Sequence, residues 1–331
     1  MPFSSVTGHR PVIELLARAV VRQALPPSLI FAGPDGVGKR RTALALAQAL
    51  NCEHPDTTPA GGTDACGRCA SCRRIARGVH ADILIIEPGE SGSIKVDQVR
   101  EAIDRAAYRP FEGRRRLVMV DEADALQSEA QNALLKTLEE PPAASVFVLI
   151  TARPDVLLPT VRSRCQRIRF GPLSPQDVAA VLMADHGFAA ADARAAAAAS
   201  DGSVGRALAD GAEEAVEARD AAARVLAAAG SSDVRRRLDA AKVLAGSGAD
   251  RDEVSRRLLA MSSLLRDLGV LSAGAAHALA NADLQPQLQA MQRTFDADRA
   301  LAAFAVVDRG LDALDRNGSP KIVADWVALH L

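Results

Sequence analysis

The segment GPDGVGKRRT, from Gly33 to Thr42, has the glycines and the lysine of a phosphate-binding loop. In the pattern G-x-x-x-x-G-K-[ST], backbone N–H groups surround phosphate oxygens at the start of a helix, the lysine reaches the terminal phosphates, and the hydroxyl binds Mg²⁺. Here the glycines of the loop would be Gly33, Gly36 and Gly38, and the lysine would be Lys39. The hydroxyl position is occupied by Arg40, which has only donors and cannot bind a cation. The pattern therefore predicts a loop of phosphate-binding shape and argues against nucleotide hydrolysis at it.

A substitute for the missing hydroxyl is hard to find nearby. Thr42 lies two residues further along, where a helix turns a side chain by about 200°, so its hydroxyl is expected to face elsewhere. The alternative to a nucleotide site is a glycine-rich turn between a strand and a helix, with no ligand.

Two acidic residues follow a short apolar run about 80 residues after this loop. The run LVMV ends at Asp121 and Glu122. At the carboxyl end of a strand, such an aspartate can hold Mg²⁺ through water and such a glutamate can polarise an attacking water. The alternative is a solvated acidic loop, which is common, but the distance from the glycine loop favours a Walker-B strand.

Four of the five cysteines have the spacing of a metal site. They follow the pattern C-x13-C-x2-C-x2-C and are Cys52, Cys66, Cys69 and Cys72. Four thiolates within a short segment suit a tetrahedral Zn²⁺ with bonds of about 2.3 Å. His54 and His80 are alternative ligands, which a complete set of four cysteines does not need. The sequence predicts a structural zinc site that stabilises an insert over about 51–77.

The elements that would position these residues change character along the chain. Apolar strands are expected at 29–32, 83–86, 117–120 and 146–150, with helices at 41–50 and 96–107. Strands that alternate with helices predict a parallel sheet covered on both faces. After about Pro172 only helical patterns remain, including an apolar stripe at three- and four-residue spacing at Val254, Leu258, Met261, Leu265 and Leu268.

Composition limits the functional classes. The 331 residues carry a net charge of -1, so contact with nucleic acid would need a local basic patch, and with 3% aromatic residues the composition argues against base-stacking platforms. No apolar run has the roughly 18 residues of a membrane span, and the N-terminal MPFSSVTGHR lacks the apolar core of a secretory signal. These features predict a cytoplasmic protein.

Five motifs occur in an order that resembles one family. They are GPDGVGKRR, the four-cysteine insert, VDEADAL, ALLKTLEEPP at 133–142 and SRC at 163–165. Together they resemble the clamp-loader subunits of bacterial DNA polymerase III within the AAA+ superfamily, and most closely the delta-prime branch. The resemblance implies a RecA-like AAA+ domain with its zinc insert at 1–172, a small helical lid at 173–211, and an all-helical collar at 212–331 that joins five subunits.

The resemblance also implies roles for single residues. Arg164 of the SRC motif would be an arginine finger that enters the ATP site of a neighbouring gamma/tau subunit, although a surface salt bridge would be the ordinary role of an isolated arginine. Thr151 falls at the sensor-1 position, and Arg206, in GSVGRAL, falls at the sensor-2 position. The implied partners are gamma/tau and delta subunits, with the sliding clamp and primer-template DNA reached through the complex.

Arg40 separates two hypotheses within this family. With an arginine in place of the magnesium hydroxyl, the chain resembles a subunit that does not hydrolyse ATP, and the alternative is an active AAA+ ATPase of the gamma/tau type. Because Lys39, Asp121, Glu122 and Arg206 are present, binding of ATP or ADP without hydrolysis stays open, with Arg40 offsetting phosphate charge.

Overall fold

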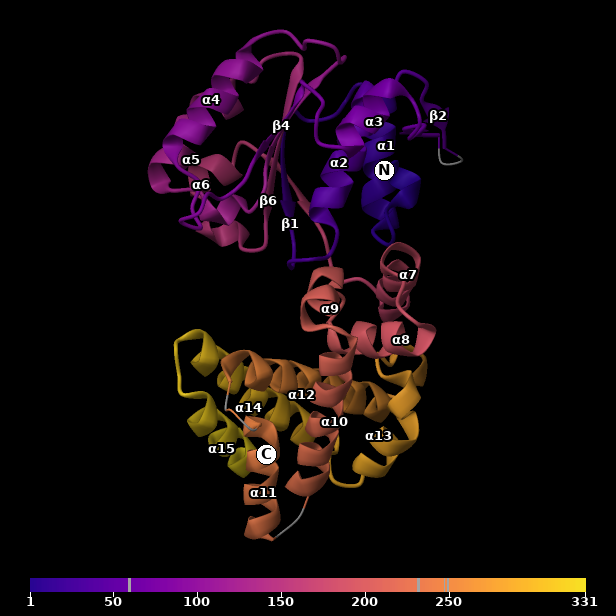
Figure 1. The fold of residues 1–331 in the computed structure, drawn as a ribbon, viewed down its shortest axis with the longest axis vertical. Helices are drawn as coiled ribbons and strands as arrows, with labels where there is room; N and C mark the ends of the chain where they lie inside the picture. The colour runs from indigo at the N-terminus through magenta and orange to yellow at the C-terminus, as the bar shows by residue number, and fades with distance from the viewer. Residues whose placement is uncertain (59–60, 231–232, 247, 249) are drawn as a thin grey trace. The chain divides into compact units, whose positions relative to one another are not determined.

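The computed structural model describes residues 1–58, 61–230, 233–246, 248 and 250–331. The chain divides into two compact units, Met1–Pro172 and Leu173–Leu331. Figure 1 shows the sheet in the first unit and the helices of the second.

The first unit is built on a five-stranded parallel sheet with the strand order β4-β5-β6-β1-β7. Its strands are β1 (Ser28–Ala32), β4 (Ile83–Ile86), β5 (Arg116–Val120), β6 (Ser145–Thr151) and β7 (Gln166–Arg169). Every residue of β1, β5 and β6 is buried, as expected for strands covered on both faces. The sequence did not predict β7, because three of its four residues are polar and exposed.

Helices cover both faces of this sheet, which confirms the predicted arrangement (Figure 1). One face packs against α4 (Val96–Ala107), α5 (Ser128–Glu139) and α6 (Pro159–Arg162), and the other against α1 (Arg10–Val21) and α2 (Lys39–Asn51). Successive strand residues point to opposite faces. Val118 and Phe147 therefore lie in one apolar cluster, and Met119 and Val148 lie in the other.

The cysteine insert is a small structure of its own between α2 and β4. It contains the antiparallel strands β2 (Asp56–Thr57) and β3 (Thr63–Asp64), followed by the helix α3 (Ala70–Ala76). The buried carboxylate of Asp64 accepts hydrogen bonds from the backbone N–H groups of Phe3 (2.6 Å) and Ser4 (2.9 Å). The insert is thereby tied to the start of the chain. Three short 3-10 helices, η1 (Phe3–Ser5), η2 (Ala123–Ala125) and η3 (Pro154–Val156), complete the first unit.

The described residues of the second unit form helices and connecting loops only. Its α-helices are α7 (Pro175–His186), α8 (Ala190–Ala199), α9 (Val204–Asp210), α10 (Ala212–Ala229), α11 (Val234–Ala245), α12 (Arg251–Ser272), α13 (Gln285–Met291), α14 (Ala297–Asp315) and α15 (Pro320–His330), with the 3-10 helices η4 (Ala276–Ala278) and η5 (Ala282–Leu284). A small apolar cluster joins α7, α8 and α9 with Ala215 of α10, and a larger one surrounds α12.

The apolar stripe predicted on α12 is buried within this unit. Its five members are 0–2% exposed and pack with residues of α10, α11, α14 and α15. The stripe therefore finds its partner helices inside the chain. No helix in the described ranges is both long enough and apolar enough to cross a membrane.

Candidate functional site

The glycine loop connects β1 to α2, which is the strand–loop–helix context that a phosphate-binding loop requires. Gly33 donates its N–H to the carbonyl of Thr151 (3.2 Å), and a Cβ at this position would lie 2.0 Å from the carbonyl oxygen of Phe170. Gly38 has φ 98°, a conformation that side chains disfavour. The close packing at Gly33 and the backbone at Gly38 explain why glycine stands at both positions.

Lys39, the first residue of α2, is folded back onto its own loop. Its Nζ donates to the carbonyl oxygens of Gly33 (2.6 Å) and Pro34 (2.7 Å) and lies 3.5 Å from Oδ1 of Asp35. Burial lowers the pKa of Lys39, and the carboxylate of Asp35 offsets part of this effect. The ammonium group is thus satisfied by the loop without any phosphate.

Arg40 lies where a magnesium site would have to form. Its guanidinium pairs with the carboxylate of Glu87, and its Nη1 also lies 2.9 Å from Oδ2 of Asp121. Burial by itself would lower the pKa of Arg40, but Glu87 and Asp121 together outweigh it and raise that pKa. The Asp121 carboxylate that the sequence assigned to Mg²⁺ therefore has a fixed cation from the protein beside it.

The nearby hydroxyl does not compensate for Arg40. Thr42 is fully buried, and its Oγ1 donates to the carbonyl of Gly38 (3.0 Å), so its hydroxyl is engaged by the backbone. With no hydroxyl ligand and with Asp121 paired to Arg40, the residues present do not fit a magnesium nucleotide.

The end of β6 carries a second polar group at the same edge of the sheet. Oγ1 of Thr151 donates to Oδ1 of Asp124 (2.8 Å), and the guanidinium of Arg153 donates to Oδ2 of Asp124 (2.9 Å). Burial opposes the charge of Asp124, but these hydrogen bonds prevail and lower its pKa. Glu122 is exposed, with φ 50°, at the start of η2.

The sheet edge therefore brings together some of the predicted residues and adds others. Asp121 and Thr151 lie at the carboxyl ends of the neighbouring strands β5 and β6, and Arg40, at the start of α2, pairs with Asp121. Sequence reasoning missed Glu87 and Asp124; the second is the third acid of VDEADAL, and that acid was the available signal. Arg206 belongs to α9 of the second unit, where its backbone N–H donates to Oγ of Ser203 (3.1 Å).

Arg164 lies between α6 and β7 and is held by a local ion pair. Its Nε donates to Oε1 of Glu139 (2.8 Å), its Nη2 pairs with the same carboxylate, and its Nη1 donates to the carbonyl of Thr160 (2.8 Å). The Arg164 side chain is 31% exposed and that of Glu139 is 49% exposed. Glu139 is the first glutamate of LEEPP, so two of the family motifs contact each other here.

The four predicted cysteines converge at the insert. Their sulfur atoms all lie within 4.8 Å of one another, and a tetrahedron with Zn–S bonds of about 2.3 Å requires about 3.8 Å between sulfurs. The ligands come from the end of α2 (Cys52), the loop after β3 (Cys66) and the start of α3 (Cys69 and Cys72). The donor set and its spacing fit Zn²⁺.

Backbone N–H groups already point at these sulfurs. Cys52 Sγ accepts from the N–H of Cys66 (3.2 Å), and Cys66 Sγ accepts from that of Cys69 (3.4 Å). The backbone N–H of Arg68 lowers the pKa of Cys66 most strongly, to about 6, whereas burial raises the pKa of Cys72. A metal ion would remove the cost of burying these thiolates, and the site would supply folding free energy rather than catalysis.

The histidines considered as alternative ligands are placed elsewhere. His54 is exposed, and the ring of His80 is hydrogen-bonded on both sides, with Nδ1 accepting from the backbone N–H of Asp82 (3.2 Å) and Nε2 facing Oγ of Ser71 (3.1 Å). Burial lowers the pKa of His80, which keeps the ring neutral. Cysteine alone therefore makes up the candidate metal site.

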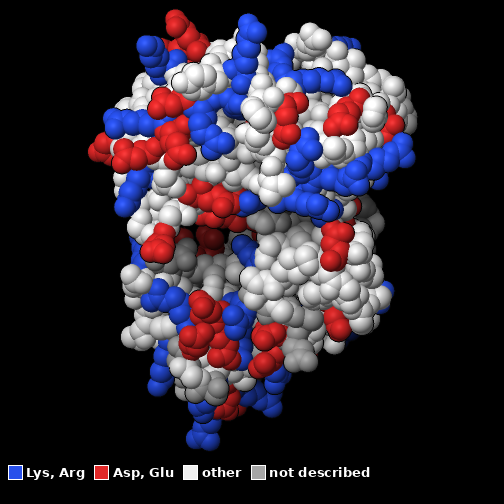
Figure 2. All heavy atoms as spheres, turned by 45° about the horizontal axis from the view of Figure 1, so that its top comes forward, with Lys and Arg blue, Asp and Glu red and all other residues white. Residues whose placement is uncertain are grey.

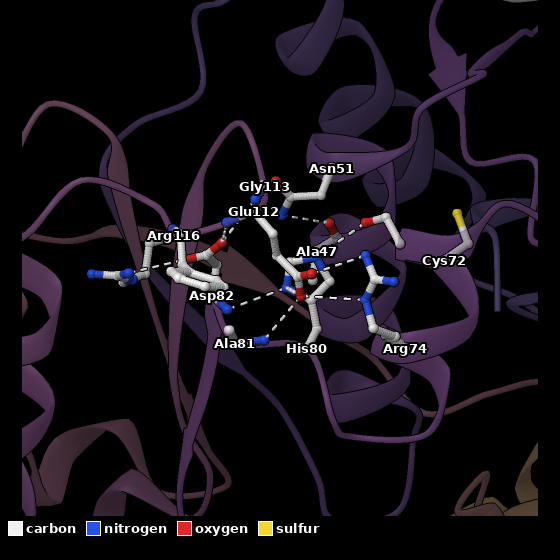
Figure 3. A network of polar contacts seen from close by, with 12 residues as sticks. Ala47, Asn51, Cys72, Arg74, His80, Ala81, Asp82, Glu112, Gly113 and Arg116 are labelled. Atoms are coloured by element: carbon white, nitrogen blue, oxygen red, sulfur yellow. Dashed lines mark hydrogen bonds and ion pairs between the residues drawn. The ribbon is translucent and has the colours of Figure 1, made fainter.

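A polar network fixes the loop that follows α4 (Figure 3). The buried carboxylate of Asp82 accepts from the backbone N–H groups of Phe111 (2.7 Å), Glu112 (2.9 Å) and Gly113 (2.8 Å) and from Nη2 of Arg116 (2.8 Å). Although burial opposes its charge, these donors lower the pKa of Asp82 to about 2. Nothing in the sequence singles out Asp82, because its partners lie about 30 residues away.

The same network joins the insert to this loop. Glu112 pairs with Nη2 of Arg74 on α3 (2.9 Å), and Oδ1 of Asn51, the last residue of α2, accepts from the backbone N–H groups of Arg114 (2.8 Å) and Arg115 (3.0 Å). The candidate zinc site, the end of α2 and the loop 108–115 are therefore held as one assembly.

Comparison with known proteins agrees with the motifs. A family model described as "DNA polymerase III, delta subunit" matches residues 8–174. The delta' subunit of Pseudomonas aeruginosa is 41% identical over 134 residues, which are 40% of this chain and 39% of that protein. The delta' subunit of Bacillus subtilis is 35% identical over 167 residues, 50% of this chain and 49% of that one.

A related subunit matches about as well. The gamma/tau subunit of Mycobacterium tuberculosis is 36% identical over 181 residues, which are 54% of this chain and 30% of that protein. The matched region thus spans about half or less of these relatives' lengths. Since the family model covers half of the chain, the protein belongs to the DNA polymerase III delta subunit family, the clamp-loader family that its motifs resemble.

Proposed function

We propose that this chain is a delta-prime-type subunit of the DNA polymerase III clamp loader and that it does not hydrolyse ATP itself. In the cytoplasm it would help to load the sliding clamp onto primed DNA, in a complex with gamma/tau and delta subunits. The observation that carries the proposal is the ion pair of Arg40 with Asp121 and Glu87. The relatives do not decide between subunits, because delta' and gamma/tau chains match to similar extents.

The chemistry of the chain's own loop supports this assignment. A hydrolytic site needs a hydroxyl and an acidic residue around Mg²⁺. Here Arg40 replaces the hydroxyl and neutralises the acidic residue, and Lys39 donates to carbonyls of its own loop. Lys39 is thus bonded to carbonyls where it would otherwise reach a phosphate, and Arg40 takes the place of the metal beside Asp121. The loop keeps its shape, and we expect no turnover at it.

The function proposed for Arg164 is to act on the ATP site of a neighbouring gamma/tau subunit. A planar guanidinium can donate two parallel hydrogen bonds to phosphoryl oxygens and stabilise the charge that develops during transfer. In the isolated chain the guanidinium of Arg164 is held by Glu139 and by the carbonyl of Thr160. We assign the lid to 173–211, with Arg206 at the sensor-2 position, and the collar that joins the subunits to 212–331.

The alternative is an active ATPase of the gamma/tau type. It would require Arg40 to leave both carboxylates and another group to bind Mg²⁺, whereas the Thr42 hydroxyl is buried and bonded to the carbonyl of Gly38. This comparison favours the non-hydrolysing subunit.

ATP binding and turnover by the isolated chain test the proposal. We expect turnover at background, unchanged by Lys39→Ala, because Arg40 keeps Asp121 from a metal. Arg40→Thr should introduce Mg²⁺-dependent nucleotide binding, since it restores a hydroxyl and frees two neighbouring carboxylates. Turnover by the wild-type chain that Lys39→Ala abolishes would establish the gamma/tau-type alternative instead.

A further inference from the structure

Two segments of the first unit concentrate arginine. Residues 65–81 and 105–116 together contain nine arginines and one acidic residue, Glu112, in a chain whose net charge is -1. The first segment includes α3 and three of the four candidate zinc ligands, and the second includes the end of α4 and the loop before β5. A bound Zn²⁺ with four thiolates would remove two positive charges, and a large excess would remain.

The two segments lie side by side. Arg74 of α3 pairs with Glu112 of the loop, and the backbone N–H of Ala81 also donates to Glu112 (3.3 Å), as Figure 3 shows. In Figure 2, Lys and Arg side chains gather over the upper part of the view, interspersed with acidic ones. The two segments are therefore neighbours in space, and we call the surface formed by their exposed arginines the arginine surface.

Most of these guanidinium groups are open to solvent and carry no ion pair. In the described part of the chain, six exposed arginines of the arginine surface have no acidic side chain within 4.0 Å, namely Arg68, Arg73, Arg77, Arg105, Arg109 and Arg114. The one acid of the surface, Glu112, is already paired with Arg74. In the described residues, ion pairs therefore leave the charge of these six guanidinium groups unneutralised.

Two aromatic rings stand among these arginines. Tyr108, the only tyrosine of the chain, is 74% exposed, and Phe111 is 84% exposed. Their loop is not loose: Asp82 accepts from the backbone N–H of Phe111, and the carbonyl of Tyr108 accepts from Nη1 of Arg116 (3.0 Å). The backbone presents both rings to solvent in a fixed conformation, which costs hydrophobic free energy unless something covers them.

We propose that the arginine surface binds single-stranded nucleic acid, with phosphates on the arginines and bases stacked on Tyr108 and Phe111. Sites that follow a single strand combine a basic track with exposed rings, because every base has a π face and every nucleotide a phosphate. A protein partner would need an interface core poor in charge, whereas these rings are separated by Arg109 and followed by Arg114. This site uses neither Arg40 nor Arg164 and does not rest on the function proposed for them.

The test is fluorescence anisotropy of a labelled single strand of about 20 nucleotides, titrated with the zinc-loaded full chain at several salt concentrations. One variant removes both rings (Tyr108→Ser with Phe111→Ser), and a second removes two charges (Arg109→Ala with Arg114→Ala). The matched control removes two exposed arginines of the second unit that make no ion pair with the described residues (Arg236→Ala with Arg293→Ala). Zinc content and thermal unfolding of each variant verify the fold.

The two variants should differ in kind. Loss of both rings should weaken binding by about 30-fold or more with an unchanged salt dependence, because stacking is not ionic. Loss of the two arginines should reduce the slope of log K against log salt by about 1.4, the value for two phosphate contacts on a single strand. The control should bind as the wild type does.

Equal affinities of all three variants would overturn the proposal. So would ring variants that bind the strand normally but no longer join the clamp-loader complex, since that result would assign the rings to a protein partner. If the ring variant fails to fold, the slope of the charge variant decides, because Arg109 and Arg114 are exposed and make no ion pair in the described structure.

Discussion

Replacing Arg164 should damage a neighbouring subunit while leaving this chain intact. The perturbation is Arg164→Ala, studied in a clamp loader reconstituted with gamma/tau and delta subunits. If Arg164 acts in trans, the variant chain folds and assembles, and turnover falls at the ATP site that would receive the guanidinium. If Arg164 is only a partner of Glu139, the defect is confined to the stability of this chain.

The structure sets the size of the two effects. Arg164 and Glu139 are 31% and 49% exposed, and ion pairs this accessible contribute about 0.2–1 kcal/mol. With the hydrogen bond to Thr160, the loss of stability should total about 1–2 kcal/mol. An arginine finger supplies about 10³–10⁵ in rate, or at least about 4 kcal/mol. Withdrawing Arg164 from Glu139 therefore costs far less than the finger provides.

The assay is single-turnover ATP hydrolysis by the assembled complex, with assembly verified by gel filtration. Arg162→Ala is the matched control, because Arg162 is two residues away and pairs with Asp155 (2.6 Å). Arg164→Lys should not restore the rate, since an ammonium lacks the planar fork. Glu139→Gln should leave turnover unchanged or raise it. Normal turnover in an intact Arg164→Ala complex would refute the finger.

Three further predictions concern the zinc site, the buried carboxylate of Asp82 and the proposed collar. Metal analysis should find one Zn²⁺ per chain, lost in Cys69→Ser and kept in Cys165→Ser, whose thiol is buried with its pKa raised to about 12; zinc retained by Cys69→Ser would contradict the ligand set. Asp82→Asn should cost about 2 kcal/mol at pH 7 in urea unfolding. Folding lowers the pKa of Asp82 from about 3.8 to about 2, so its contribution to stability is complete above pH 4 and disappears as pH falls towards 2. The difference in unfolding free energy between Asp82→Asn and the wild type should therefore vanish near pH 2. A difference that does not change with pH would argue against a role for the charge. A chain that ends at residue 211 should keep its zinc but no longer copurify with clamp-loader subunits, and continued copurification would place assembly outside the proposed collar.

The features that the sequence could predict are local ones. The strands are short apolar runs, the glycine loop has fixed spacing, and the cysteines cluster within one segment. Each of these patterns is therefore complete within a short stretch of sequence. The strand β7 escaped because its outer position leaves most of its residues exposed, and exposed residues do not produce an apolar run.

The partners of the predicted residues could not be read in the same way. Arg40 contacts Glu87 and Asp121, which are 47 and 81 residues away. The order of the strands in the sheet brings these residues together, and the sequence around each residue does not reveal that order. The sequence identified Arg40 by what it lacks, a hydroxyl. Its role as an internal counter-ion appears only when the carboxyl ends of β4 and β5 are placed beside α2.

The helix α2 begins at Lys39 in the glycine loop and ends at Asn51, directly before the first cysteine of the insert. Its 13 residues make a rod about 20 Å long with two sites attached to its ends. Each added or deleted residue would turn one end by about 100° relative to the other, so that Cys52 and Lys39 could not both keep their places. The helix therefore sets both the distance and the relative rotation of the two sites, and we expect an insertion or deletion within it to disrupt at least one of them.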